Sequence, residues 1–376
     1  MLIVVDDKIP FLKGVLEPFF EVLYKSGPDI RPADLIHADA MIIRSRTLCN
    51  KDLLKGSKVR FIASATIGYD HIDTDWCAAN NIRWTNAEGC NSASVAQFIT
   101  AALVHLARKY HFRFEDRTLG VIGVGNVGRK VVKVAEGLGM RVVINDPPLV
   151  KSAGLCGFVS LDGLLREADI ITLHVPLTFT GEDRTFYIAD EKFFSKVNNG
   201  SFFFNSSRGE VCSTEALKSA LQKGSIKDAV CDVWENEPII DKSLLNKIAI
   251  GTPHIAGYSM DGKAKGTEMV VKNLARFFGI PELLNWKPAA IPSPEPSTIT
   301  LDNTRLSFQE TISKAIESTY SIQQDDNNLR INPSDFEKLR GDYPFRREFH
   351  AYSVKLKKED EKLTDSLKRL GFQVYY

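Results

Sequence analysis

The sequence predicts an α/β protein built on parallel sheets, with a small α+β domain at its C-terminal end. Short β-branched runs alternate with amphipathic stretches through the first three quarters of the chain. Near residue 288 four prolines fall within ten residues and mark a stiff connector to a final segment. With 376 residues the chain is long enough for two or three domains, each with its own core.

Composition excludes several classes of protein. Lys plus Arg total 48 and Asp plus Glu total 47, so no overall charge attracts nucleic acid or an anionic membrane. A content of 44% hydrophobic and 25% charged residues is typical of a globular chain and not of a disordered one. No apolar run reaches the roughly 18 residues of a membrane span, and the start MLIVVDDK does not resemble a signal peptide. The cysteines are scattered and the histidines lack metal-ligand spacing, so we expect a reduced, cytoplasmic protein without a metal.

The first ninety residues predict one α/β unit. We expect strands at residues 2–7, 39–46, 59–66 and 82–87. Between the first two lies an amphipathic stretch, Phe11 to Lys25, of the kind that forms a helix between parallel strands. Ser92 or Ser94 then caps a long helix that continues through residues 95–111.

A second α/β unit follows, and its six strands in series fit a doubly wound sheet. The expected strands are 118–123, 140–146, 169–175, 200–207, 226–234 and 247–255, with helices at 160–168, 213–224 and about 259–279. The last segment, from about residue 298, mixes helical and strand-like patterns, which predicts a small α+β domain. Its helical patterns are 305–318, 334–341 and 358–371, and its strand-like runs are 347–355 and 372–376.

The strongest local motif is a GxGxxG sequence between a predicted strand and a predicted helix. Gly123 permits a tight turn, and Gly125 lets backbone N–H groups approach a pyrophosphate at the helix N-terminus. Gly128 lets the helix pack closely on the sheet. Asp146 ends the next strand 18 positions after Gly128, where a carboxylate binds the adenosine ribose hydroxyls. Together these residues predict a Rossmann dinucleotide-binding domain.

The residues around Asp146 favour NAD over NADP. The carboxylate would repel a 2′-phosphate, and Pro147 and Pro148 offer no compensating cation. Lys151 is the nearest positive charge that could weaken this preference.

Three charged side chains follow strands of the second sheet: Arg208, Glu237 and His254. Open α/β sheets bind their ligands at the carboxyl ends of the strands. Oxidation of a hydroxy acid requires a base for the hydroxyl proton, a cation for the carboxylate and a hydride acceptor, which nicotinamide supplies. We assign His254 as the acid/base, Glu237 as the carboxylate that orients its ring, and Arg208 as the substrate clamp.

With these motifs in family order, the chain resembles the D-2-hydroxyacid dehydrogenases, the D-isomer-specific NAD-dependent enzymes. The resemblance covers roughly residues 35 to 280, through ATIGYDHID, GVGNVG, LHVPLT, FNSSRGEV, DVWENEP and TPHIAGYS. It implies that Arg208, Glu237 and His254 are catalytic. It further implies a flavodoxin-like substrate domain (1–91 and 257–285) into which the NAD-binding Rossmann domain (92–256) is inserted, with the active site in the cleft between them. Residues 286–376 would then form the C-terminal domain.

Further segments, LTFTGEDRTFYIAD and HIAGYSMDGKAKGT, resemble members that act on a phosphorylated 2-hydroxy acid and form a homodimer through the C-terminal domain. The resemblance places Ser45, Thr66 and Tyr258 in substrate binding. It also implicates a set of cofactor-binding residues: Gly123, Gly125, Asn126, Val127, Gly128, Asp146, Val175, Pro176, Ser206, Ser207, Arg208, Asp232 and Gly257.

The phosphate of such a substrate needs cations. Arg44 and Arg46 flank Ser45 and are the first candidates, since both could reach a strand end together. Arg346 and Arg347, in the C-terminal domain, are a second candidate pair.

Two alternatives stay open. Another D-2-hydroxyacid dehydrogenase, of the phosphoglycerate or glycerate type, would share every catalytic residue and differ in its substrate pocket. A non-catalytic NAD-sensing corepressor or scaffold could retain the same fold and polar residues. The C-terminal tail shows neither the pattern of an appended regulatory domain nor a long disordered extension.

Overall fold

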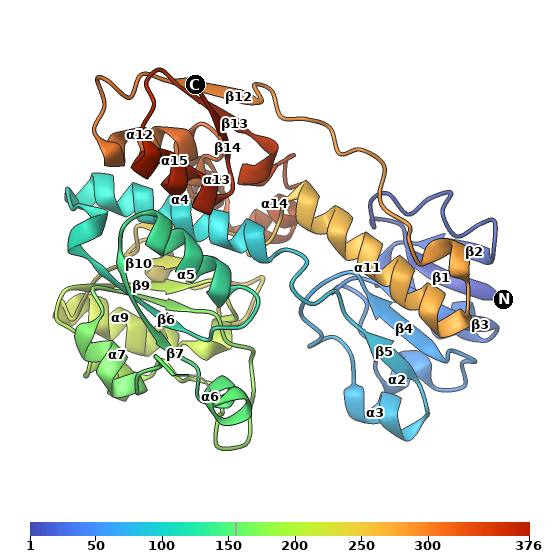
Figure 1. The fold of residues 1–376 in the computed structure, drawn as a ribbon. Helices are drawn as coiled ribbons and strands as arrows, with labels where there is room; N and C mark the ends of the chain where they lie inside the picture. Colours follow the sequence, from blue (N-terminus) through green and yellow to red (C-terminus); the bar gives the residue numbers. More distant parts are fainter. Residues whose placement is uncertain (155) are drawn as a thin grey trace. The chain divides into compact units, whose positions relative to one another are not determined.

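The structure is a computed structural model that describes residues 1–154 and 156–376, and the chain forms two compact units. Unit 1 comprises residues 1–91 and 259–292, and unit 2 comprises residues 92–258 and 293–376. Both units are α/β, with parallel strands and helices on the faces of the sheets (Figure 1). None of the helices in the described part of the chain is long and apolar enough to cross a bilayer.

Unit 1 is a five-stranded parallel sheet in the order β2-β1-β3-β4-β5. This is the flavodoxin-like strand order, as the family resemblance implies. Its strands are β1 (Leu2–Asp6), β2 (Glu21–Lys25), β3 (Ala38–Ile43), β4 (Phe61–Ser64) and β5 (Arg83–Thr85). Its helices are α1 (Pro32–Leu35), α2 (Lys51–Leu54), α3 (Thr74–Ala79) and α11 (Met260–Phe278).

Alternating side chains of the central strand cover both faces of this sheet. Ala40 and Ile42 of β3 pack in the cluster that contains Leu274 of α11, and Phe277 of α11 stacks on Phe61 of β4. Met41, the residue between them, packs in a second cluster with residues of α1, α2 and α3. The period of two along the strand therefore requires helices on both faces.

Two expectations about this region are wrong. The stretch from Phe11 to Lys25 is not a helix, because residues 11–20 form turns and the rest forms the edge strand β2. Phe11 and Gly14 have φ values of 63° and 84°, which a right-handed helix cannot contain. Neither serine is the expected N-cap, because α4 (Ser92–Tyr110) already begins at Ser92 and contains Ser94.

The larger sheet of unit 2 has six parallel strands in the order β11-β10-β9-β8-β6-β7, which confirms the predicted doubly wound sheet. A single bridge between Ile144 and Phe158 continues it beyond β7. The strands are β6 (Thr118–Ile122), β7 (Arg141–Asn145), β8 (Ile170–Leu173), β9 (Ser201–Asn205), β10 (Ile226–Cys231) and β11 (Ile250–Gly251). The helices are α4, α5 (Gly128–Gly137), α6 (Pro147–Ala153), α7 (Leu161–Glu167), α8 (Glu191–Phe194), α9 (Thr214–Lys223) and α10 (Lys242–Leu245).

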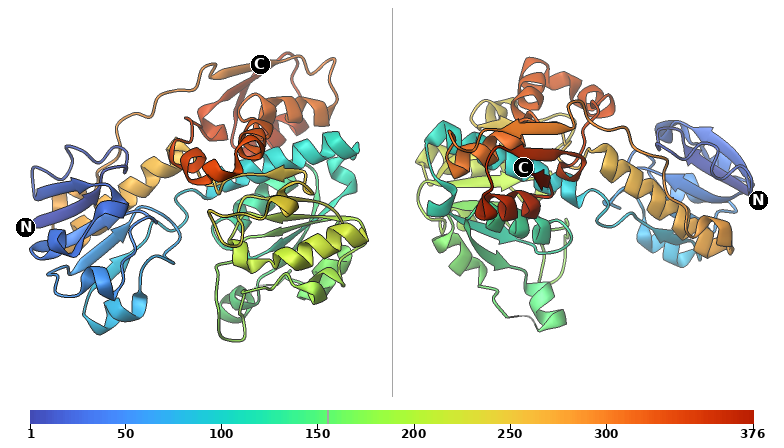
Figure 2. Two further views of the ribbon diagram at one scale, coloured as in Figure 1. Left: turned by 180° about the vertical axis from the view of Figure 1, so that it is seen from behind. Right: turned by 45° about the horizontal axis from the view of Figure 1, so that its top comes forward.

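The C-terminal segment forms a three-stranded parallel sheet, β12-β13-β14, with four helices. Its elements are β12 (Thr298–Leu301), α12 (Phe308–Glu317), α13 (Ile322–Ile331), α14 (Phe336–Gly341), β13 (Ser353–Leu356), α15 (Glu361–Leu370) and β14 (Gln373–Tyr375). The segment shares one hydrophobic core with α4 and α5 of unit 2 and lies along α4 in Figure 2. Neither β12 nor α13 stood out in the sequence, and the boundaries of a separate third domain stay a prediction.

Candidate active site

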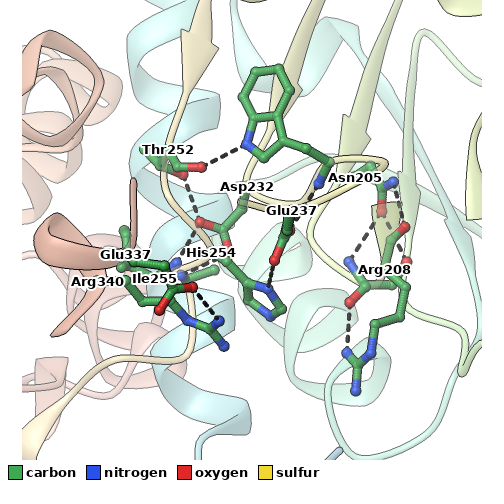
Figure 3. A network of polar contacts seen from close by, with 12 residues as sticks. Asn205, Arg208, Asp232, Glu237, Thr252, His254, Ile255, Glu337 and Arg340 are labelled. Atoms are coloured by element: carbon green, nitrogen blue, oxygen red, sulfur yellow. Dashed lines mark hydrogen bonds and ion pairs between the residues drawn. The ribbon is translucent and has the colours of Figure 1, made fainter. Parts of the chain in front are cut away.

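The three predicted catalytic residues follow three neighbouring strands of the unit 2 sheet (Figure 3). Arg208 follows β9, Glu237 lies in the loop after β10, and His254 follows β11. Because these strands are parallel, their carboxyl ends lie along one edge of the sheet, which is where open α/β sheets bind ligands.

His254 and Glu237 form a direct pair. Nδ1 of His254 lies 2.7 Å from Oε2 of Glu237, and Oε1 of Glu237 accepts a hydrogen bond of 3.0 Å from the backbone N–H of Trp234. Burial opposes ionisation of Glu237, but the charge and hydrogen bond of His254 and the Trp234 bond hold its pKa below the ordinary value. The ionised carboxylate is an acceptor only, so Nδ1 of His254 carries the proton and Nε2 is the atom available for proton transfer.

The backbone at His254 is held in an uncommon conformation. Its φ is 57°, in the left-handed region, and its N–H donates to the carbonyl oxygen of Asp232 at 2.7 Å. The buried carboxylate of Asp232 accepts three further bonds, from the Thr252 hydroxyl (2.6 Å) and from the N–H groups of Ile255 (2.7 Å) and Ala256 (2.9 Å). Burial raises the pKa of Asp232 in spite of these donors. Asp232 thus fixes the loop from which the imidazole projects.

The Arg208 loop is fixed against the loop that carries Glu237. Asn205, the last residue of β9, donates to the Arg208 carbonyl (2.9 Å) and accepts from the Ser207 hydroxyl (2.9 Å). A Cβ at Gly209 would lie 2.0 Å from the carbonyl carbon of Trp234, so only glycine allows these backbones to touch. The guanidinium of Arg208 donates through Nη1 to the Ser207 carbonyl (2.7 Å).

The glycine turn after β6 has the geometry of a dinucleotide site. Gly123 has φ of 87°, and a Cβ there would lie 2.5 Å from the His174 carbonyl. A Cβ at Gly128 would lie 2.0 Å from the carbonyl oxygen of Gly123, whereas one at Gly125 would meet nothing within 4 Å. Asn126 and Val127 lie between this open position and α5, whose first N–H groups point out of the helix N-terminus. The turn therefore fits a bound pyrophosphate.

Asp146 lies beside this turn at the end of β7. Its carboxylate accepts from the N–H of Val124 (2.8 Å) and from the N–H of Leu149 (2.9 Å) in the first turn of α6. Lys151, the cation that could favour NADP, is paired with Glu182 (2.8 Å) and Asp183 (3.2 Å). The charge of Lys151 is therefore compensated by carboxylates and is not free for a 2′-phosphate.

The other predicted cofactor-binding residues lie in loops after strands of the same sheet. Val175 and Pro176 follow β8, and Gly257 lies in the turn closed by the Tyr258 N–H to Ile255 carbonyl bond. Ser206 and Ser207 follow β9, and within the described residues the buried Ser206 hydroxyl has no hydrogen-bond partner. An orphaned hydroxyl at this position fits a polar ligand such as a dinucleotide. Contacts of these residues with NAD stay predictions.

The predicted substrate residues of unit 1 follow β3 and β4. Ser45 and Arg46 are exposed directly after β3, and the Thr66 hydroxyl lies 2.8 Å from that of Ser64. Arg44 donates to both carboxylate oxygens of the buried Asp6, at 3.1 and 3.3 Å. The charge of Arg44 is therefore largely compensated within the protein.

Arg346 and Arg347 are not surface cations, contrary to the second candidate pair for the phosphate. Arg346 is only 5% exposed and Arg347 only 8%. Arg346 donates to the carbonyls of Ile255 (3.2 Å) and Ala256 (2.7 Å) and to the Ser94 hydroxyl, and its guanidinium lies 4.5 Å from the centre of the Tyr320 ring. It is a structural residue that holds the loop after His254.

Comparison with known proteins identifies the family. The model for the D-isomer specific 2-hydroxyacid dehydrogenase, NAD binding domain, matches residues 96–256. Erythronate-4-phosphate dehydrogenase of Bacteroides thetaiotaomicron is 46% identical over 355 residues, covering 94% of this chain and 99% of that protein. The chain belongs to the D-isomer specific 2-hydroxyacid dehydrogenase family. The Escherichia coli protein of the same name is 37% identical over 379 residues, covering 100% of this chain and 99% of that protein.

Solved structures of D-2-hydroxyacid dehydrogenases share the fold. D-lactate dehydrogenase of Aquifex aeolicus, complexed with NAD and lactic acid, is 26% identical, with a TM-score of 0.61 over 78% of this chain and 100% of that one. NAD+-bound 3-phosphoglycerate dehydrogenase of Entamoeba histolytica is 25% identical, with a TM-score of 0.64 over 78% of this chain and 99% of that one. Residues 291–371 match a domain model of unknown function. This protein is thus an NAD-dependent D-2-hydroxyacid dehydrogenase with a C-terminal segment beyond the shared fold.

Sequence reasoning missed the residues by which that C-terminal segment contacts the site of this dehydrogenase. Asp326 of α13 accepts from the N–H of Gly251 in β11 (2.7 Å), and Arg330 pairs with Asp326 (2.8 Å). Arg340 of α14 donates to the Tyr258 hydroxyl (3.0 Å). No local motif marks Asp326 and Arg340, because each is defined by a contact with a residue more than seventy positions away in the chain.

Proposed function

We propose that the protein oxidises 4-phospho-D-erythronate to 3-hydroxy-2-oxo-4-phosphobutanoate with NAD, a step in pyridoxal 5′-phosphate biosynthesis. The observation that carries the chemistry is the His254–Glu237 pair of 2.7 Å at the same sheet edge as Arg208 and the glycine turn. The substrate follows from relatives named erythronate-4-phosphate dehydrogenase, which match the chain through its C-terminal segment.

Each of the three proposed catalytic residues has a distinct role in the reaction. Arg208 binds the substrate carboxylate through charge-assisted hydrogen bonds and polarises the developing carbonyl group. Nε2 of His254 accepts the proton of the C2 hydroxyl, because Nδ1 already donates to Glu237. The carboxylate of Glu237 fixes the ring and stabilises the imidazolium that forms. Bound NAD supplies the hydride acceptor.

The remaining site residues bind the two ligands. Gly123, Gly125, Asn126, Val127 and Gly128 would hold the pyrophosphate, and Asp146 the adenosine ribose. The residues after the other strands would complete the cofactor site: Val175, Pro176, Ser206, Ser207, Asp232 and Gly257. Ser45, Thr66 and Tyr258 would bind substrate, together with Arg46, whereas the predicted Arg44 is already paired with Asp6.

We also propose that the enzyme is a cytoplasmic homodimer, with residues 286–376 as the dimerisation domain. The six cysteines are all free in the structure, as expected in a reducing compartment. Residues 1–91 with 257–285 would form the substrate domain and residues 92–256 the NAD-binding domain.

The test is a turnover assay with purified protein, NAD and 4-phospho-D-erythronate, in which NADH absorbance is followed in the presence of a product trap. D-glycerate and 3-phospho-D-glycerate serve as competing substrates. A higher kcat/KM for either competitor would assign the enzyme to the glycerate or phosphoglycerate type. NAD binding without oxidation of any of the three would favour the binding-protein alternative.

A further inference from the structure

The α14 helix places a guanidinium beside the proposed catalytic residues. Nε of Arg340 donates to the Tyr258 hydroxyl at 3.0 Å, and the guanidinium carbon lies 5.8 Å from the centre of the Tyr258 ring. Tyr258 follows His254 by four residues on the same loop. In Figure 3 Arg340 approaches this loop from the C-terminal segment. Its charge acts at the site, because it contributes to the lowered pKa of Glu237.

This guanidinium is mostly buried and poorly satisfied. The Arg340 side chain is only 16% exposed, yet only one of its five N–H donors has a hydrogen-bond acceptor among residues 1–154 and 156–376. The nearest carboxylate, that of Glu337, is 3.8 Å from Nη1 and is itself 43% exposed. Glu337 thus gives Arg340 one partly exposed ion-pair partner, and the Nη atoms are not among the fully buried atoms that lack a partner. Their unused donors are therefore accessible and can bind an anionic ligand.

Arg346, a second arginine of the C-terminal segment, differs from Arg340 in its hydrogen bonding. Arg346 uses its donors within the protein, on the carbonyls of Ile255 and Ala256 and on the hydroxyls of Ser94 and Tyr343. Two arginines six positions apart thus contact the same loop. Arg346 makes four hydrogen bonds to protein acceptors through Nη1 and Nη2, although its buried Nε has no partner among the described residues, whereas Arg340 makes one. Packing of the loop therefore accounts for Arg346 and not for Arg340.

The proposed substrate carries two anionic groups. Arg208 is assigned to its carboxylate, and Arg44 is already engaged by both oxygens of Asp6. A phosphate accepts two parallel N–H bonds from one guanidinium, which an arginine with unused donors can supply. We infer that Arg340 is a specificity-determining residue that binds the substrate phosphate next to Tyr258. This inference rests on the proposed function, and it assigns recognition of the second anion to the C-terminal segment.

The experiment compares 4-phospho-D-erythronate with unphosphorylated D-erythronate in wild type, Arg340→Met, Arg340→Lys and Lys338→Met. Lys338 is the matched control, because it is an exposed cation on the same helix and its loss changes the net charge equally. For Arg340→Met we expect kcat/KM for the phosphorylated substrate to fall roughly 10- to 100-fold, mainly through KM, as for loss of a charge-assisted hydrogen bond. D-erythronate should lose less than about 3-fold, Arg340→Lys should lose less than Arg340→Met, and Lys338→Met should match wild type.

Equal losses for both substrates in Arg340→Met would overturn the inference, because they would show that Arg340 only positions Tyr258 and Glu237. Unchanged kinetics with the phosphorylated substrate would overturn it as well. Failure of wild type to oxidise 4-phospho-D-erythronate would instead contradict the proposed function. In that case calorimetric titration of the NAD-loaded protein with inorganic phosphate decides: weaker binding by Arg340→Met than by Lys338→Met supports the anion site, and equal binding refutes it.

Discussion

The imidazole of His254 and the carboxylate of Glu237 are joined by a contact of 2.7 Å between Nδ1 and Oε2, although 17 residues separate them in the chain. The pair depends on a buried third group, Asp232, which holds the loop of His254 through its backbone carbonyl and its carboxylate. The proton-transfer atom Nε2 therefore has a defined tautomer and a defined position before any ligand binds.

Substitution of His254 should lower the turnover rate without changing the affinity for the cofactor. His254→Asn is the suitable variant, because asparagine tolerates the left-handed φ of 57° better than alanine does. We expect kcat to fall roughly 100-fold or more, the usual contribution of general acid–base catalysis, while the Kd for NADH stays unchanged. The exposed His37→Asn serves as control. Turnover by His254→Asn within a few-fold of wild type would show that the base lies elsewhere.

Removing the charge of Glu237 should alter both catalysis and acid stability. In Glu237→Gln the amide N–H₂ can donate to Nδ1 of His254, which leaves the proton on Nε2 and disables it as a base. Because the pKa of Glu237 is lower in the folded protein than its ordinary value of 4.5, this carboxyl stabilises the fold above that pH. That stabilisation is lost as the pH falls through the folded pKa.

The measurement for Glu237 is urea unfolding from neutral pH into the acid range, alongside kcat at neutral pH. Glu237→Gln should lose part of the increase in unfolding free energy with pH that wild type shows near and below pH 4.5. The control is Glu282→Gln, which removes an exposed carboxyl in unit 1. This variant should keep the wild-type increase in unfolding free energy with pH. Identical pH slopes for Glu237→Gln and wild type would refute the stabilising role of the ionised pair.

Alanine substitutions at two glycines of the turn after β6 should differ in their effects on stability and on NAD affinity. A Cβ at Gly128 would lie 2.0 Å from the Gly123 carbonyl oxygen, so Gly128→Ala should lower both the melting temperature and the affinity for NAD. Gly125 has open space at that position, so Gly125→Ala should fold like wild type and lose only NAD affinity. Thermal melting and NADH fluorescence titration measure both effects. Full NAD affinity in Gly125→Ala would mean that the open space does not hold the cofactor.

Asp146→Ala should weaken NAD binding and reduce discrimination against NADP. The variant removes both the ribose acceptor and the repulsion of a 2′-phosphate, and we expect roughly a tenfold loss of NADH affinity from the lost hydrogen bonds. The gain for NADPH should be small, because Lys151 is paired with Glu182 and Asp183. Titrations with NADH and NADPH give the ratio of the two dissociation constants in wild type and in Asp146→Ala. An unchanged preference for NADH would place selectivity outside Asp146.

Arg346→Met, a substitution in the C-terminal segment, should lower both the stability and the turnover of the enzyme. It removes the bonds of Arg346 to the carbonyls of Ile255 and Ala256, which keep other donors in the Tyr258 N–H and the Ser94 hydroxyl. The cost is then about 1.5–3 kcal/mol in unfolding free energy for each lost hydrogen bond to the charged group. Because Ile255 and Ala256 follow His254 directly, kcat should fall as well. The control Arg369→Met removes an exposed ion pair and should change stability by less than about 1 kcal/mol. Wild-type kcat in Arg346→Met would show that the loop holds its position without this residue.

Local sequence was enough to predict several parts of the fold and of the site. The glycine turn is readable because steric limits act on single residues, as at Gly128, and the strands are readable because their apolar runs are continuous. The order of motifs along the chain identified the family before any contact was known. The stretch from Phe11 to Lys25 shows the limit, because its amphipathic pattern fits an edge strand and turns as well as a helix.

What the sequence by itself determined is which residue types follow each strand of the Rossmann sheet, because the carboxyl ends of parallel strands meet at one edge. Only the tertiary structure decided which of many similar charges act there. It buried Arg346 against backbone carbonyls, paired Arg44 with Asp6 and left Arg340 beside Tyr258 with unused donors. The physical reason is that desolvation and the available acceptors depend on contacts between distant segments, and a linear pattern does not contain them.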